Sequence, residues 1–333
     1  MVRLASGRLA ATLRAGAVAI VLLAGAPAVA NPAFATWLDA LRREAERRGI
    51  SAATIQAALT GLSPIPRVLE LDRRQPELTL SLREYLSRYV STPRIERGRA
   101  RLAEHRELLD EIGAKYGVPP RFIVALWGLE TDYGQSVGDF PVIAALATLA
   151  YDGRRSALFR EELFAALRII DLGHVTTRNL RGSWAGAMGQ SQFLPSSFLR
   201  FAVDHDGDGR PDIWTSRPDV FASIANYLAQ AGWREGETWG HPVRLPAGFD
   251  GASAPLAGAR PLAEWQRLGV RRPNGSDLPT GDTPASLLRP GPAGASTYLV
   301  LDNVRVLMRW NPSTLFAIAV GHLADAIEGV REE

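Results

Sequence analysis

One glutamate stands at the end of an apolar segment, where its carboxyl group is suited to acid–base chemistry. Pro119-Pro120 favours a helix start, because proline fits the first helical turn, whose N–H groups have no helical partner. Glu130 falls on or beside an apolar stripe of this helix, over the Trp127 indole; the stripe is formed by Phe122, Ile123, Leu126 and Leu129. Removal from water disfavours the anion, so a carboxyl group placed there keeps its proton near neutral pH and can protonate a leaving group. On spacing alone, a glutamate that reaches water at the helix end or pairs with an arginine is the alternative.

A second block lies some fifty residues further on, from Gly182-Ser183-Trp184-Ala185-Gly186 through Gln190-Ser191-Gln192 to Pro195. Its small residues allow the backbone to approach a ligand closely. Ser183, Gln190 and Gln192 offer neutral donors and acceptors suited to sugar hydroxyls and acetamides. Tight helix packing through glycine and alanine is the alternative.

These two blocks, followed by Ala225-Asn226-Tyr227-Leu228 and Gly232-Trp233, resemble the lytic murein transglycosylases of the membrane-bound lytic transglycosylase B-like family. The resemblance runs from Trp37 to Ala326. It implies an α+β, mainly α fold: a lysozyme-like catalytic core with a glycan groove, extra N-terminal helices and a small β/loop region.

The resemblance also implies that Glu130 is the single catalytic acid/base. Such an enzyme cleaves the MurNAc–GlcNAc β-1,4 bond of peptidoglycan and leaves 1,6-anhydro-N-acetylmuramic acid ends. Two alternatives stay open, a muramidase-type hydrolase and a non-catalytic or weakly active peptidoglycan-binding scaffold. A two-carboxylate hydrolase needs a second acid about 5 to 9 Å away; Asp132 points elsewhere on a continuous helix, whereas Asp139 and Asp152 lie in expected loops.

The remaining substrate contacts are implied by the resemblance. Ser183 and Gln192 would hold the sugar, Tyr227 would line the groove, and Arg154 with Arg155 would meet the acidic lactyl and peptide part of muramic acid. An exposed arginine pair and a core tyrosine are the alternatives.

The C-terminal part departs from the family. The family usually has Tyr-Asn, then Ser, then Tyr-Ala, whereas this chain has Trp310-Asn311-Pro312-Ser313 and Phe316-Ala317. We expect that hydrogen bonds from the two phenolic hydroxyls to the sugar or to Glu130 are lost and that stacking persists. Trp310 and Asn311 are groove candidates, and Phe316 is expected only to pack.

An aspartate-rich loop is typical of calcium sites. From Asp204 to Asp212, carboxylates occupy loop positions 1, 3, 5 and 9 and glycine occupies position 6. Asp204, Asp206, Asp208 and the Arg210 carbonyl are the candidate ligands, and the resemblance adds Asp219. Pro211 at position 8 and Thr215 at position 12 depart from the pattern, and a surface loop of Asx turns without an ion is the alternative. We expect a structural Ca2+ and no cofactor in the reaction.

Composition and the N-terminus indicate where the protein acts. Residues 1–30 carry three arginines and no acid, then an apolar run and Ala28-Val29-Ala30, which is typical of a secretory signal; a membrane anchor helix is the alternative. Without this segment, 35 basic residues face 35 acidic ones, which disfavours a nucleic-acid partner. The chain has no cysteine and therefore no lipid attachment through one. We expect an exported, periplasmic monomer whose partners are peptidoglycan glycan strands and cell-wall synthesis or hydrolysis proteins.

The sequence divides into segments of different character. After the signal, we expect a helical part at 31–117, the catalytic core at 118–240, a small β/loop region at 241–300, and a closing strand and helix at 301–333, all within one lytic transglycosylase domain at 31–333.

Overall fold

The computed structural model describes residues 32–74, 80–249, 258–279, 281–290 and 296–330. The predicted signal segment, 1–30, lies outside the described residues. The described chain is mainly helical with a few short strands, as the sequence predicted. None of its helices combines the length and the apolar character needed to cross a bilayer.

The helices fall into three sets along the chain. The N-terminal set is α1 (Pro32–Arg47), α2 (Ala52–Leu59), α3 (Pro66–Arg73), α4 (Leu82–Tyr89), α5 (Thr92–Glu104) and α6 (Arg106–Tyr116). The central set is α7 (Pro120–Thr131), α8 (Val142–Asp152), α9 (Ser156–Asp171), α10 (Pro195–Phe201) and α11 (Arg217–Gln230). The last set is α12 (Leu262–Arg267), α13 (Asp302–Trp310) and α14 (Thr314–Glu328).

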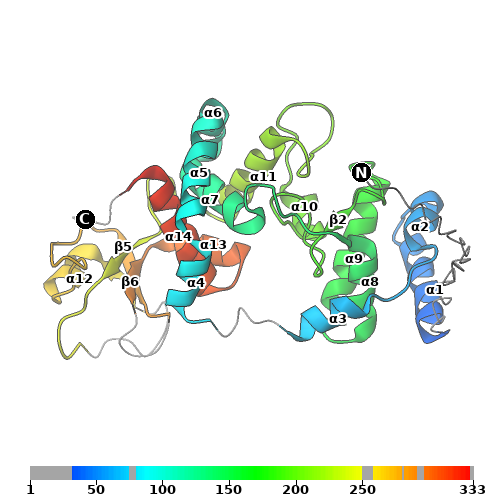
Figure 1. Ribbon diagram of the computed structural model, residues 1–333, viewed down its shortest axis with the longest axis horizontal. Helices are drawn as coiled ribbons and strands as arrows, with labels where there is room; N and C mark the ends of the chain where they lie inside the picture. The colour runs from blue at the N-terminus through cyan, green and yellow to red at the C-terminus, as the bar shows by residue number, and fades with distance from the viewer. Residues whose placement is uncertain (1–31, 75–79, 250–257, 280, 291–295, 331–333) are drawn as a thin grey trace, which may run out of the picture.

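Two sheets complete the fold, and every strand pair is antiparallel. β1 (Phe140–Pro141) pairs with β2 (Arg181–Gly182) in the central part. The larger sheet has the order β3-β6-β5-β4, with strands at Gly240–Val243, Thr297–Val300, Pro284–Leu288 and Arg260–Pro261. In Figure 1 this sheet lies at the opposite end of the molecule from α1 and α2, with α7 and α14 between them.

Three hydrophobic clusters hold these elements together. The first surrounds α7 and α14 and includes Trp127, and the second surrounds α8 and α9 with the N-terminal helices α1 to α3. A small third cluster, which includes Trp265, belongs to the larger sheet. The half-buried rings of Tyr227 and Trp310 pack against both the first and the second cluster. The two main helical cores therefore meet along a seam of aromatic side chains.

The last segment differs from the expected closing strand and helix at 301–333. The strand β6 ends at Val300, and the short amphipathic helix α13 lies between it and α14. Ser313 begins α14 by accepting a hydrogen bond from the Phe316 N–H. Helix α13 escaped the periodicity analysis because its nine residues give little more than two turns of pattern.

Candidate active site

Helix α7 carries Glu130 in its last turn. All side chains from Phe122 to Gly128 are buried, so the helix is surrounded by the core rather than striped. The helix ends at Thr131, and Asp132 (φ 50°) and Tyr133 (φ 62°) adopt the left-handed conformation. Glu130 is half-buried at this end of the helix.

Trp310 donates a hydrogen bond directly to the candidate acid. Its Nε1 lies 2.6 Å from Glu130 Oε1. The expectation that replacing the family tyrosine removes the hydrogen bond to Glu130 was therefore wrong, because the indole N–H supplies a donor. Phe316 is 5% exposed and packs in the core, as expected. Asn311 follows Trp310, and its Oδ1 accepts a hydrogen bond from the Ser313 N–H.

Two aromatic rings, those of Tyr227 and Phe193, pack against Trp310. The Tyr227 and Trp310 ring centroids lie 4.7 Å apart, and those of Phe193 and Trp310 lie 5.3 Å apart. The Tyr227 hydroxyl donates to the Arg309 carbonyl at 2.7 Å, and burial raises the pKa of Tyr227. Tyr227 thus contributes its ring, while its hydroxyl holds the end of α13.

Gln190 is buried in the protein and does not lie at the surface of the candidate active site. Its side-chain Nε2 donates to the Trp214 carbonyl at 2.7 Å, and its Oε1 accepts from Trp127 Nε1 at 2.9 Å. Both polar ends are therefore engaged within the protein, and the residue is only 4% exposed. This arrangement speaks against the predicted sugar contact and makes Gln190 the link between the 182–195 loop and α7. The indole of Trp127 is accordingly directed at Gln190.

Thr131 strengthens the same link and was missed by the sequence analysis. Its hydroxyl donates to the Gln190 carbonyl at 2.9 Å and accepts from the Gly134 N–H at 3.1 Å. A polar β-branched residue at the end of an otherwise apolar helix is the signal that could have identified it.

Ser183 and Gln192 lie partly exposed in the loop. Ser183 Oγ accepts from the Ala187 N–H at 3.0 Å, which leaves its hydroxyl proton for another acceptor. Gln192 is left-handed (φ 50°), and its Nε2 donates to the carbonyls of Gly189 at 2.9 Å and Val137 at 3.1 Å. Its Oε1 receives no hydrogen bond from the residues described. Each side chain thus stabilises the loop and keeps one group that can hydrogen-bond to a ligand: the hydroxyl O–H of Ser183 and the Oε1 of Gln192.

Close backbone contacts explain the glycines around the site. A Cβ at Gly134 (φ +83°) would lie 2.3 Å from Gln190 Oε1, and one at Gly182 would lie 2.0 Å from the Ala187 carbonyl oxygen. A side chain at either position would collide with a neighbouring group, so both glycines are required by close packing within the protein; the contact at Gly182 lies within the loop and not between helices.

Arg154 and Arg155 both bind Asp72 of α3. Asp72 is 3% exposed; Arg154 Nε donates to its Oδ2 at 2.8 Å, and Arg155 also forms an ion pair with it. The side chains of Arg154 and Arg155 are 52% and 43% exposed to solvent. The pair is therefore tied to the second hydrophobic cluster through a buried aspartate that the sequence analysis missed, because more than eighty residues separate the partners.

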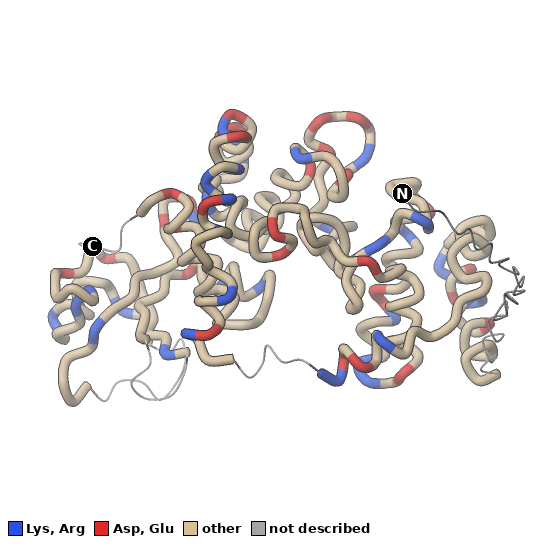
Figure 2. The backbone as a smooth tube through the Cα atoms, viewed as in Figure 1, with Lys and Arg blue, Asp and Glu red and all other residues tan. Residues whose placement is uncertain are grey.

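The acids nearest to Glu130 in sequence have other surroundings. Asp132 accepts hydrogen bonds from Arg97 at 2.7 Å and Arg94 at 3.3 Å. Asp152 forms an ion pair with Arg73 at 3.1 Å, and Asp139 is exposed. Charges of both signs occur in the N-terminal, central and C-terminal parts of the described chain (Figure 2).

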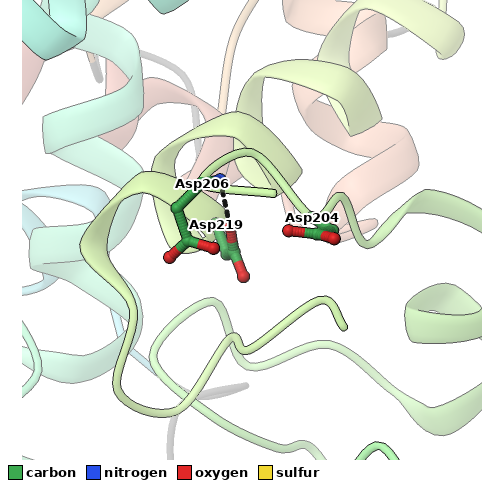
Figure 3. Close-up of side chains that lie close together, drawn as sticks. All are labelled: Asp204, Asp206 and Asp219. Carbon is green, nitrogen blue, oxygen red and sulfur yellow. Dashed lines mark hydrogen bonds between the residues drawn. The ribbon is translucent and has the colours of Figure 1, made fainter. Parts of the chain in front are cut away.

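The aspartate loop brings three of its predicted ligands together. Oxygens of Asp204, Asp206 and Asp219 lie within 4.8 Å of one another (Figure 3), a spread that fits oxygen ligands about 2.3 to 2.6 Å from a calcium ion. Asp219 is fully buried, and burial raises its pKa. Asp208 stands apart from this cluster: its Oδ1 accepts from the Arg210 N–H at 3.1 Å.

A half-buried glutamate at the end of a core helix in a mainly helical fold is the arrangement expected of lysozyme-like glycan-cleaving enzymes. Comparison with known proteins agrees: residues 33–325 match the transglycosylase SLT domain family, and the chain belongs to that family.

Three relatives are informative. The chain is 29% identical over 319 residues to membrane-bound lytic murein transglycosylase B of Escherichia coli K12, covering 89% of this chain and 83% of the relative. It is 47% identical to SltB3 of Pseudomonas aeruginosa, solved in complex with NAG-anhNAM-pentapeptide, with a TM-score of 0.85 over 89% of this chain and 80% of that one. It is 29% identical to the Escherichia coli lytic transglycosylase Slt35 in complex with calcium, with a TM-score of 0.76 over 91% and 95% of the two chains. The chain is accordingly a lytic transglycosylase-family enzyme that acts on peptidoglycan.

Proposed function

We propose that this chain cleaves the MurNAc–GlcNAc β-1,4 bond with formation of 1,6-anhydro ends and that Glu130 is its single acid/base. The observation that carries the proposal is the hydrogen bond of 2.6 Å from Trp310 to Glu130 at the seam of the two helical cores. The complex of SltB3 with NAG-anhNAM-pentapeptide supports the same product class.

The steps follow from one carboxyl group used twice. Glu130 gives its proton to the bridging oxygen, the bond from that oxygen to C1 of the muramic sugar breaks, and the 2-acetamido oxygen of that sugar attacks C1. The Glu130 carboxylate then takes the proton of the C6 hydroxyl, O6 displaces the acetamido oxygen at C1, and the anhydro ring closes. The proton returns to Glu130, and no water is consumed.

The substrate contacts extend from this centre. Ser183 and the Oε1 of Gln192 present the polar functions that remain for a sugar, while the rings of Trp310 and Tyr227 provide stacking surface. Asn311 lies next to Trp310, which supports its place in the groove. Arg154 and Arg155 retain exposed N–H groups beyond those bound to Asp72, so they keep the capacity to meet an acidic stem.

Mass spectrometry of muropeptides released from purified sacculi tests the proposal. The wild-type chain is expected to release products one water lighter than hydrolysed muropeptides, and Glu130→Gln is expected to release none while keeping its thermal unfolding. Glu107→Gln, at an exposed position of α6, is the matched control and should cleave like the wild type. Products with reducing ends would identify a hydrolase, and binding to sacculi without products from the wild type would identify a scaffold.

We also propose that the aspartate loop binds calcium as a structural brace. Asp204, Asp206 and Asp219 supply carboxylates, as hard cations prefer, and a cation would offset the burial of Asp219. The calcium complex of Slt35 supports this assignment. The ion has no part in the cleavage steps above.

The place of action is proposed from the substrate and the N-terminal sequence. Peptidoglycan lies outside the bacterial inner membrane, and residues 1–30 have the pattern of a secretory signal. We therefore infer a periplasmic monomer that acts on glycan strands beside proteins of cell-wall synthesis or hydrolysis.

A further inference from the structure

A cavity whose lining does not include Glu130 lies beside the aspartate loop, and the loop contributes Arg210 and Asp212 to it. It has a volume of about 630 Å3 and opens between the loop after α9, residues 173–181, and the segment before α11, residues 210–215. Three arginines line it: Arg178, Arg181 and Arg210.

The cavity has an excess of positive charge. Its one acid, Asp212, accepts hydrogen bonds from the N–H groups of Trp214 at 2.9 Å and Thr215 at 2.8 Å, so its carboxylate is already satisfied. Arg181 uses one N–H on the Asp139 carbonyl at 2.6 Å, and Arg210 lies 3.7 Å from Asp208. Arg178 is exposed and forms no hydrogen bond or ion pair with any residue in the described ranges. Guanidinium groups with unused donors in a concave place recognise carboxylates through paired N–H groups.

The other walls favour a peptide over a small inorganic ion. Trp214 and Val175 contribute apolar surface, and Asn179 and Thr176 contribute neutral polar groups. The volume is far larger than one anion needs and fits several residues of chain with amide groups.

A hydrogen bond also connects the cavity to the 182–195 loop, which carries Ser183 and Gln192. The Trp214 carbonyl accepts from Gln190 Nε2 at 2.7 Å, and Gln190 in turn binds Trp127 of α7. Arg181 stands two positions before Ser183 in the sequence. A ligand in the cavity would therefore contact segments that carry or support the substrate-facing loop.

We propose that this cavity binds the carboxylate-bearing stem peptide of peptidoglycan. The proposal rests on the proposed function, since it assigns a part of the same substrate to a second place on the enzyme. The cavity is a peptide contact in addition to the one proposed for Arg154 and Arg155, and it is separate from the cleavage of the glycan at Glu130.

Calorimetric titration of the full chain with the free stem tetrapeptide L-Ala-γ-D-Glu-meso-diaminopimelyl-D-Ala tests it without any cleavage step. Arg178→Glu is expected to weaken binding by about tenfold or more, because it replaces an attraction with a repulsion. Arg83→Glu, which makes the same charge change at an exposed position of α4, should bind like the wild type. Amidation of the peptide carboxylates should weaken binding to the wild type by a similar factor.

Three results would overturn the proposal: no binding of the tetrapeptide to the wild type, equal binding by Arg178→Glu, or binding of inorganic phosphate as tight as that of the peptide. Cleavage of sacculi by the same preparations is scored separately. A wild-type chain that binds the peptide but releases no anhydro products would refute the proposed function and leave the peptide site standing.

Discussion

Replacing Trp310 by phenylalanine removes one donor from the candidate acid while keeping an aromatic ring at the seam. The indole N–H lies 2.6 Å from Glu130 Oε1. A hydrogen bond to a charged group contributes about 1.5 to 3 kcal/mol, and we take the lower end because Glu130 is only half-buried. The bond favours the anion over the neutral acid, so its loss makes Glu130 hold its proton to higher pH.

The expected consequence is a shift in the pH dependence of kcat/KM. Protonated Glu130 starts the reaction, so kcat/KM falls as pH rises and the carboxyl group ionises. The basic limb of Trp310→Phe should therefore move to higher pH, by at most about one unit, the value that about 1.5 kcal/mol gives if the neutral acid gains nothing from the bond. The maximal rate should also fall, because the carboxyl group is less firmly oriented.

The assay is release of anhydro products from soluble glycan strands across a range of pH. Trp310→Tyr is the matched variant, since the phenol returns a hydrogen-bond donor to an aromatic ring at this position. In Trp310→Tyr, kcat/KM should fall at high pH over nearly the same range as in the wild type. An unchanged limb in Trp310→Phe would refute the assigned role of the indole N–H, and an equal displacement in both variants would assign the effect to ring shape instead.

Three further predictions concern stability. Gly134→Ala should lower the free energy of unfolding in urea by about 2 kcal/mol or more, because the residue is left-handed and the new Cβ would meet Gln190 Oε1; an unchanged midpoint would contradict this. Asp72→Asn should cost about 1 to 2 kcal/mol in the same assay, the half-exposed arginines limiting the loss, and an equal or higher stability would show that the ion pairs contribute nothing. Calcium at about 100 times its Kd should stabilise the wild type by about 2.7 kcal/mol and leave Asp206→Ala unaffected; identical melting of the wild type with and without calcium would remove the ion from the loop.

The location of the candidate acid could be predicted from the sequence because it depends on local geometry. Helical spacing and a proline start are enough to place Glu130 at the end of a buried helix. The role of Gln190 could not be predicted in this way, because its partners Trp127 and Trp214 lie 63 and 24 residues away. A glutamine in a glycine-rich loop has the same sequence signature whether it meets a sugar or the core. The hydrogen bond from Trp310 spans 180 residues and was equally invisible.

The aspartate loop, unlike the hydrogen bonds of Gln190 and Trp310, could be located from the sequence. Its spacing is a short-range pattern, and the structure brings Asp204 and Asp206 together with Asp219. Asp208 follows the same spacing and accepts from the backbone of the turn, as Asp204 does, but its carboxylate is not part of the converging group. A pattern of alternate aspartates thus predicts the location of the loop better than it predicts which carboxylates converge.

The candidate active site lies where the two helical cores meet. Glu130 belongs to a helix of the first core, whereas Phe193, which contacts Trp310, is buried in the second. Trp310 therefore depends on both cores for its position, since its ring packs against residues of each. A misplacement of about 1 Å at a reacting group can cost about a hundredfold in rate. Substitutions that widen the seam should consequently reduce cleavage at temperatures where each core is still folded.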